Sequence, residues 1–339
     1  MALRRRELFG LGGIAGALGV LGGLAWPLNK PKSSKLADAT LPMRDADCIG
    51  DASAAGTGVG YSAQFAPPGY VAAGSRDDLH TPPPWGPKTD EVRQFDLSVI
   101  ETTLEVADGH SITAWAYGGT VPGPILRATV GDRLKVTLAN HSNGAHSVHF
   151  HGAHDVSQDG IGRVAKGENR TYEFEAGPAG LHPYHCHVPP YARHVGKGMY
   201  GAMIVDPLQP RSPAHEFVLT LCSFDVDGDG KSEIYAWNGM AGYYERFPLK
   251  VPVGDLVRLY VINMVESDPI ASFHLHAQTF DLYRSGTSAS PQEHTDIVSL
   301  GPAERAIVEF RLPRRGRYMF HPHQSRMAER GAMGWIVAI

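Results

Sequence analysis

The second half of this 339-residue chain repeats the first half. The segment GDRLKVTLAN at residues 131–140 matches GDLVRLYVIN at residues 254–263. Several further landmarks of the first half return at a common offset of 136 positions. They are Glu173-Phe174, Gly180, His185 and His187, which recur as Glu309-Phe310, Gly316, His321 and His323. This shared offset predicts two copies of one domain, joined near residues 207–213.

Short strand-like segments make up the first copy. FDLSVIETTLEVA, ITAWAYG, RLKVTLAN, RTYEFEA and GAMIVDP follow one another with turn residues between them, and no long amphipathic helix is evident. Many short strands with such spacing are typical of a β-sandwich. We therefore predict an all-β fold with two Greek-key β-sandwich domains, at residues 90–207 and 214–339.

Residues 1–28 have the character of an export signal. A basic run precedes an apolar, glycine-rich stretch, and Arg5 and Arg6 resemble the pair of a bacterial twin-arginine signal. A single-span membrane anchor is the alternative, because no clear A-x-A cleavage site follows. Both interpretations place the body of the protein in the periplasm or outside the cell. Residues 29–89 contain clusters of Pro and Gly and are predicted to be an extended arm or linker.

Composition excludes several classes of protein. The net charge is −4, and no Lys/Arg cluster follows the first six residues, so we expect no nucleic-acid partner. Three cysteines are too few for a disulfide scaffold, although Cys48 and Cys222 could pair in an oxidising compartment. The segment DVDGDGKSE at residues 225–233 begins like a calcium loop, but Ala236 stands where such a loop needs Glu. An acidic hairpin turn is the better interpretation.

Histidine pairs of the form H-x-H point to metal binding. Random placement of the 17 histidines would give roughly one such pair, and the chain has four. Along a strand, residues i and i+2 point to the same face, so each pair offers two nitrogens together. Eight imidazoles exceed the needs of one tetrahedral zinc and indicate several ions, for which copper is suitable. The pairs are His149/His151, His185/His187, His274/His276 and His321/His323.

Seven further histidines show no such pattern, and we predict that they are ordinary surface residues. They are His80, His110, His141, His154, His182, His215 and His294.

Cys186 stands between His185 and His187, so its side chain leaves the opposite face of the strand. His194 and Met199 follow it, and a further histidine, His146, lies three residues before the first pair. Two histidines, a cysteine and a methionine are the ligands of a blue-copper electron-transfer site. The alternation predicts one copper on the thiolate face and other ions on the histidine face, on the order of 10–15 Å away.

The second copy lacks this cysteine site and keeps both histidine pairs. Pro322 replaces Cys186, and the shared landmarks align the other three ligands with non-ligating residues. These are Ala271 for His146, Arg330 for His194 and Ala332 for Met199. The second domain is therefore predicted to supply histidines only.

The motifs HSVHFHG, HPYHCHVPPYARHVGKGM, FHLHAQTF and FHPHQSRM, with TVPGPILRATVGD, resemble those of bacterial two-domain multicopper oxidases of the laccase-like group. The resemblance covers about residues 90–339 and implies two cupredoxin-like domains that bind four coppers per chain. It assigns the type 1 copper to His146, Cys186, His194 and Met199, and the type 2 copper to His149 and His274. It assigns the type 3 pair to His151, His185, His187, His276, His321 and His323.

The resemblance also implies an activity. Phenols, aromatic amines or metal ions would be oxidised one electron at a time, and O₂ would be reduced by four electrons to water. Electrons would enter past His194 and cross Cys186, with Asp159 as the candidate proton relay and Asp155 as the reserve. Each trinuclear cluster would lie between the first domain of one chain and the second domain of the next, in a homotrimer.

Other functions remain open at this point. Copper nitrite reductase, which converts nitrite to nitric oxide, is similar, but its catalytic copper needs three histidines, and it has Asp at the position of His149 and no counterpart of His187. A copper carrier or electron-transfer protein would not need a thiolate between two histidines. A cuprous oxidase would usually have a Met-rich segment, whereas the nine methionines are scattered.

Overall fold

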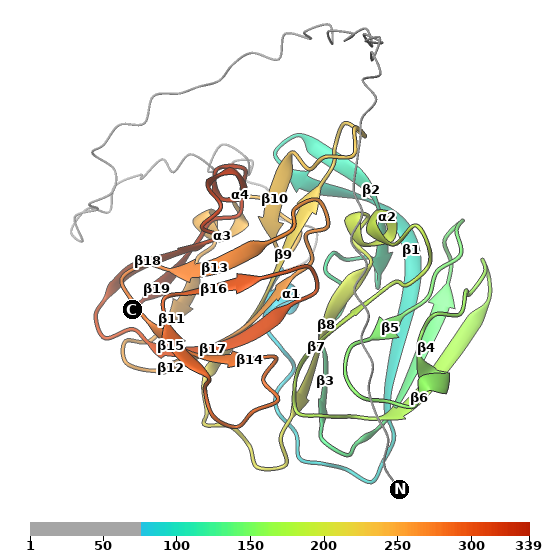
Figure 1. Ribbon diagram of the computed structural model, residues 1–339, viewed down its shortest axis with the longest axis horizontal. Coiled ribbons are helices and arrows are strands. Elements are labelled where there is room, and N and C mark those ends of the chain that lie inside the picture. Colours follow the sequence, from blue (N-terminus) through green and yellow to red (C-terminus); the bar gives the residue numbers. More distant parts are fainter. Residues whose placement is uncertain (1–75) are drawn as a thin grey trace, which may run out of the picture. The chain divides into compact units, whose positions relative to one another are not determined.

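The computed structural model describes residues 76–339, whose regular secondary structure is mostly β-strand (Figure 1). The predicted export signal, most of the predicted arm and Cys48 lie outside the described residues. Among the residues that are described, no helix is long and apolar enough to cross a membrane.

The first domain has two four-stranded sheets. In β4, Leu134, Val136 and Leu138 are buried and alternate with more exposed residues, as expected where one face of a sheet covers a core. The first sheet has the order β2 (His110–Tyr117), β1 (Arg93–Ala107), β4 (Arg133–Asn140), β6 (Asn169–Glu175). The second has the order β3 (Leu126–Thr129), β8 (Tyr200–Asp206), β7 (Gly180–His185), β5 (His149–Phe150).

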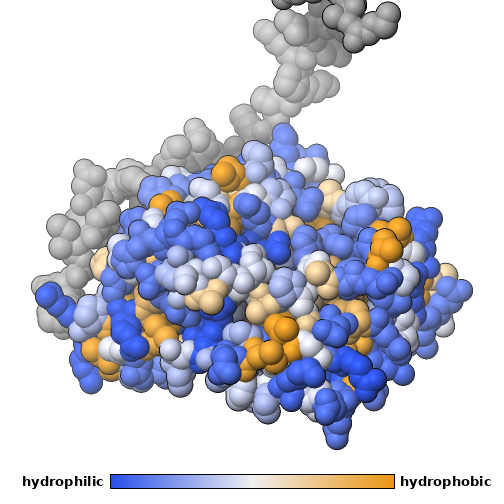
Figure 2. Space-filling view, turned by 60° about the horizontal axis from the view of Figure 1, so that its bottom comes forward, coloured by the Kyte–Doolittle hydropathy of each residue, from blue (hydrophilic) through white to orange (hydrophobic). Residues whose placement is uncertain are grey.

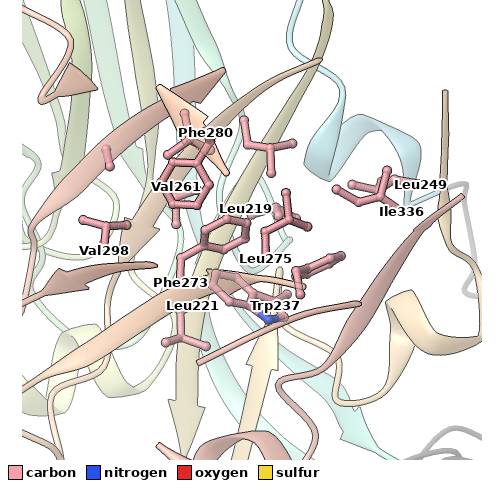
Figure 3. Close-up of a cluster of buried hydrophobic side chains, with 14 of the residues drawn as sticks. Leu219, Leu221, Trp237, Leu249, Val261, Phe273, Leu275, Phe280, Val298 and Ile336 are labelled. Carbon is pink, nitrogen blue, oxygen red and sulfur yellow. The ribbon is translucent and has the colours of Figure 1, made fainter. Parts of the chain in front are cut away.

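The second domain has a six-stranded and a five-stranded sheet. Its core contains Trp237, Phe273 and Phe280, which are almost completely buried (Figure 3). The larger sheet has the order β10 (Ile234–Trp237), β9 (His215–Phe224), β12 (Leu256–Asn263), β17 (Arg305–Arg311), β14 (Phe280–Arg284), β15 (Glu293–Thr295). The smaller has the order β11 (Leu249–Val251), β19 (Gly334–Ala338), β18 (Gly316–His321), β13 (Ala271–Leu275), β16 (Ile297–Leu300).

Short helices connect some of these strands. They are α1 (Asp77–His80), the 3₁₀ turn η2 (Val156–Gln158), α2 (Tyr191–Gly196), α3 (Tyr243–Arg246) and α4 (Ser325–Glu329).

Both domains share one topology. In each domain the first long strand runs parallel to its neighbour, β1 beside β4 and β9 beside β12. The last strand of each domain also runs parallel to a short strand, β8 beside β3 and β19 beside β11. The fold is therefore all-β with two cupredoxin-like sandwiches, as the repeat predicted.

A layer of apolar side chains joins the two domains. It includes Leu181 and Ile204 from the first domain, and Val218, Tyr260 and Ile307 from the second. The backbones also meet, because Leu181 N donates to Ser285 O at 2.7 Å. Gly180 permits this approach, since a Cβ there would lie 2.5 Å from Ser285 O. The two sandwiches therefore share buried surface as well as a connecting segment.

The described part of the arm packs against both domains. Arg127 and Thr129 of the first domain donate to the carbonyls of Pro83 and Gly86. His80 is buried, and its Nδ1 lies 3.2 Å from Tyr244 Oη in the second domain. The prediction that His80 is a surface residue was wrong, because its ring packs against Phe217 and Tyr244 of the second domain.

The acidic segment at residues 225–233 connects β9 and β10, which pair as an antiparallel hairpin. Asp225, Asp227 and Asp229 accept hydrogen bonds from backbone amides of this turn, in agreement with the hairpin interpretation. On the face shown in Figure 2, hydrophobic residues form small separate patches in a mainly hydrophilic surface.

Glu245 in α3 gives the fold a specific pH dependence. Burial raises its pKa from 4.5 to about 7, opposed in part by Arg317, and its Oε1 has no hydrogen-bond partner among residues 76–339. The unfolded chain would release this proton at a lower pH than the folded chain. We expect stability to fall by up to about 3 kcal/mol as the pH rises from 4.5 through 7. Chemical denaturation of Glu245→Gln across this range should show a correspondingly flatter curve.

The exposed Glu329 offers a matched control, since Glu329→Gln should leave the wild-type pH dependence in place. An equal pH dependence in Glu245→Gln and the wild type would contradict this assignment.

Candidate metal centres

Three side chains converge at one end of the first sandwich. His146 is held by paired backbone hydrogen bonds with Val164, Cys186 follows β7 directly, and His194 lies in α2. The Nδ1 atoms of His146 and His194 are 3.2 Å apart, and Cys186 Sγ is 3.1 Å from His194 Nδ1. His146, which is 48 positions from His194, thus joins His194 and Cys186 in presenting two nitrogens and one sulfur to a common point.

Met199 belongs to the loop that closes this group. It is completely buried, its amide donates to His194 O, and its carbonyl accepts from Cys186 N at 3.0 Å. Trp115 of β2 covers the same group, with its ring 5.2 Å from that of His146 and 4.8 Å from that of His194.

The protonation states of this group suit a metal ion. Burial, with a smaller contribution from His194, lowers the pKa of His146 to about 4. Burial also lowers the pKa of His194 and raises that of the Cys186 thiol. A neutral imidazole protonated at Nε2 has a lone pair at Nδ1, so both of the facing Nδ1 atoms can serve as ligand atoms. A cation bound between them would satisfy both nitrogens and lower the pKa of the thiol.

The first-domain histidine pairs form a second group. His149 and His185 are direct cross-strand partners, so the pairs His149/His151 and His185/His187 lie on one face. The Nε2 atoms of His151 and His185 are 3.1 Å apart. The group opens into a surface pocket of about 360 Å³ lined by His149, His151, His154 and Asp159 among others.

The second domain repeats this arrangement. His274 and His321 are direct cross-strand partners, and the Nε2 atoms of His276 and His321 are 2.8 Å apart. His276 and His323 are exposed. Among residues 76–339, no group of three converging ligand atoms draws histidines from both domains. Each domain therefore presents its own open set of four histidines.

Hydrogen bonds fix the orientation of several of these rings. The Nδ1 atoms of His185, His274 and His321 lie 2.8–3.0 Å from backbone carbonyls. The Nδ1 of His149 lies 2.5 Å from Asp159 Oδ1. Because these oxygens accept, Nδ1 carries the proton and the Nε2 lone pair is free for a metal ion. The donor set and its orientation therefore fit copper.

We expect Asp159→Asn to weaken metal binding at His149. The carboxylate orients the ring and raises the basicity of Nε2, and loss of such a partner typically costs about 10–100-fold in metal affinity. Copper titration should show one weakened site per chain. Asp155→Asn is the control, because the Asp155 carboxylate accepts its hydrogen bond from Ser157 N. Equal copper affinity in Asp159→Asn and Asp155→Asn would contradict the orienting role.

The sequence did not identify two histidines that lie next to these groups. His154 was predicted to be an ordinary surface residue, yet its ring lies 6.3 Å from that of His149. His182 was given the same prediction, which was wrong, since it is 1% exposed behind the first-domain pairs. Neither has an H-x-H partner, so only the fold reveals its position.

The alignment of His194 with Arg330 was also wrong. The amide of Met199 donates to His194 O, and the amide of Ala332 donates to Met327 O in the same way. The buried Met327 is therefore the counterpart of His194, and a loop of different length explains the error. With Ala271, Pro322 and Ala332, it fills the position of the cysteine site with buried apolar residues.

Two cupredoxin-like domains with these donor groups define a copper protein of the cupredoxin class. Sequence models described as multicopper oxidase match residues 98–210 and 211–338. The chain therefore belongs to the multicopper oxidase family.

The similar proteins include both copper nitrite reductases and multicopper oxidases. A copper-containing nitrite reductase from Neisseria meningitidis serogroup A is 30% identical over 264 residues, which are 71% of this chain and 68% of the relative. A crystal structure of a multicopper oxidase is 40% identical with a TM-score of 0.72, over 73% of this chain and 89% of that one. A copper nitrite reductase from Nitrosomonas europaea is 29% identical with a TM-score of 0.68, over 74% and 94% of the two chains.

Proposed function

We propose that this protein is a laccase-like oxidase that couples one-electron oxidation of phenols, aromatic amines or metal ions to four-electron reduction of O₂ to water. The observation that carries the proposal is the presence of eight histidines in two matching groups beside a separate cysteine group, with four of the rings oriented by hydrogen bonds at Nδ1. A single catalytic copper would use only a few of these nitrogens.

The cysteine group is proposed to hold the type 1 copper, for which His146, Cys186, His194 and Met199 would be the ligands. The facing Nδ1 atoms and the nearby Sγ support this assignment. Cys186 is bonded through the main chain to His185 and His187, so the polypeptide itself connects the two kinds of centre.

The histidine groups are proposed to hold three further coppers. His149 and His274 would bind the type 2 copper, and each has Nδ1 occupied by an oxygen acceptor. The two close Nε2 pairs suggest the division of the type 3 ligands, because each pair can share one ion. One ion would take His151 and His185, the other His276 and His321, and His187 and His323 would complete the pair.

Assembly into a homotrimer would unite these half-sites. The histidine groups of the two domains are separate within one chain, and part of the second-domain group is exposed. A head-to-tail contact that brings the second-domain group of one chain to the first-domain group of the next closes as a ring.

Residues of this chain would perform defined tasks in the reaction. Bound coppers would store and pass single electrons, which links a one-electron donor to O₂. Trp115 shields the cysteine group from water, and His194 lies between that indole and Cys186 Sγ. Asp159 orients His149 and is placed at the first-domain pocket, where it can pass protons from solvent into the pocket. We further propose that the protein is exported, on the basis of the twin-arginine pattern in residues 1–28.

Nitrite reduction is the second candidate, because copper nitrite reductases are among the similar proteins. The histidines at positions 149 and 187 favour the oxidase, since both lie in the first-domain group and add ligands beyond three.

Copper content per chain after full loading tests the proposal. The oxidase should contain close to four coppers and consume O₂ with a phenolic donor. A content close to two, with reduction of nitrite to nitric oxide, would contradict the proposal and support the second candidate.

A further inference from the structure

We propose that the electron donor of this protein is a small anionic aromatic molecule, which is received by Arg163 and Arg193 beside the half-buried indole of Trp115. This inference rests on the proposed function, because it identifies the substrate class of the same electron-entry site.

Trp115 connects the surface to the cysteine group. Its ring is partly exposed and meets the rings of both His146 and His194 edge-on, at interplanar angles of 65° and 62°. Its backbone amide donates to Lys197 O, which fixes β2 against the end of α2. A donor in contact with this indole is therefore one ring away from two of the metal-binding histidines. Aromatic donors suit such a surface, because offset or edge contacts between rings are favourable.

One positive charge lies over this indole, and a second lies next to the backbone segment that pairs with His146. The guanidinium of Arg193 lies 5.4 Å from the centre of the Trp115 ring. Arg163 adjoins Val164, whose backbone forms the paired hydrogen bonds with His146. Both arginines are exposed, and neither forms an ion pair with any carboxylate within residues 76–339.

The nearby acidic side chain does not cancel the positive charge of the two arginines. Glu101 is the acidic group whose field reaches His146. Its carboxylate is bonded to Asn143, and Asn143 accepts from the ammonium group of Lys166, which offsets part of the negative charge. The positive charges of Arg193 and Arg163 both act on the imidazole of His194. The chain carries a net charge of −4, so a local positive region at the electron entry is not a consequence of overall composition.

The second domain contains an internal comparison. Arg326 lies over the ring of Tyr235 at 5.6 Å, as Arg193 lies over Trp115. There, however, Arg326 is 3.9 Å from Asp268, and Tyr235 Oη donates to the same carboxylate. The arginine–aromatic contact is thus a property of the repeated fold. Within residues 76–339, the arginine of this contact has no carboxylate partner in the domain with the cysteine group, whereas the arginine of the other domain has one. This difference points to an anionic ligand at Arg193.

Anaerobic stopped-flow reduction of the blue absorption band tests the inference. Hydroquinonesulfonate and neutral hydroquinone form a matched pair of donors. With the anionic donor, Arg163→Gln/Arg193→Gln should reduce the band about tenfold more slowly than the wild type at low salt, and the difference should diminish at high salt. With hydroquinone, the two proteins should differ less than twofold. Arg326→Gln is the control and should resemble the wild type with both donors.

Binding to the copper-free protein gives a second measurement that requires no electron transfer. Benzenesulfonate should change the tryptophan fluorescence of the wild type, and this change should be lost in Trp115→Phe and weakened in the double arginine variant. Equal rates and equal binding in wild type and double variant would overturn the inference. If no blue band forms after copper loading, the proposed function fails instead, and the fluorescence titration still decides whether this surface binds anions.

Discussion

Replacing Cys186 by serine is expected to abolish the blue absorption band and reduce donor oxidation to the background rate. The thiolate is the ligand that defines a blue-copper site, and a serine hydroxyl does not replace it. One copper per chain should be lost, while the histidine groups retain theirs. Because serine is close to cysteine in size and the side chain is buried, the variant should remain folded. Absorption spectra, copper analysis and O₂ consumption measure these effects.

Cys222→Ser provides the matched control. Cys222 is also a free and fully buried cysteine, but burial raises its pKa to about 11 and its Sγ donates to Ala236 O in the layer between the domains. This variant should keep the blue band and the oxidase activity. Retention of the band in Cys186→Ser, or its loss in Cys222→Ser, would show that the wrong cysteine has been assigned.

Arg127→Met is expected to destabilise the protein by about 3–5 kcal/mol. Arg127 forms two hydrogen bonds with Asp206, at 2.6 and 3.0 Å, and two with Glu216, at 2.7 and 3.4 Å. Its side chain is 5% exposed, and so is that of Asp206. Removal of the guanidinium would leave two carboxylates at the domain boundary with less compensation. Thermal and urea denaturation of the copper-loaded protein measure the loss.

Two further variants test whether the loss of stability comes from the buried ion pairs of Arg127. Arg133→Met removes an exposed arginine of β4 and should change stability by less than about 0.5 kcal/mol. Adding Glu216→Gln to Arg127→Met should recover part of the loss, because one uncompensated charge is removed. An equal stability of Arg127→Met and Arg133→Met would mean that the buried ion pairs contribute little.

The same network predicts the acid behaviour of the wild type. Although burial acts to raise the pKa of Glu216, hydrogen bonds from Arg127, Arg258 and Tyr260 lower it below 4.5 overall. Its contribution to stability is therefore present above pH 4.5 and is lost as the pH falls through the lower folded pKa. This loss of stability should be smaller in Arg127→Met/Glu216→Gln, which lacks the Glu216 carboxylate.

Local sequence patterns determined much of this protein. Alternation of apolar residues in RLKVTLAN predicted a strand that the structure places at Arg133–Asn140, with the same bounds. The H-x-H spacing placed each pair on one face of a strand because side-chain direction repeats every two residues. The repeat predicted that His149/His185 and His274/His321 would occupy equivalent positions, and both are direct cross-strand pairs.

Tertiary structure alone decided how distant residues meet. Asp159 contacts His149 across a loop, Arg127 pairs with Glu216 across 89 positions, and the apolar layer joins strands of both domains. Met327, and not Arg330, takes the place of His194 because a loop differs in length. Periodicity along a strand is set by the geometry of the local backbone and can be read from sequence. Contacts between loops, arm and domains depend on how the whole chain packs, and no local spacing encodes them.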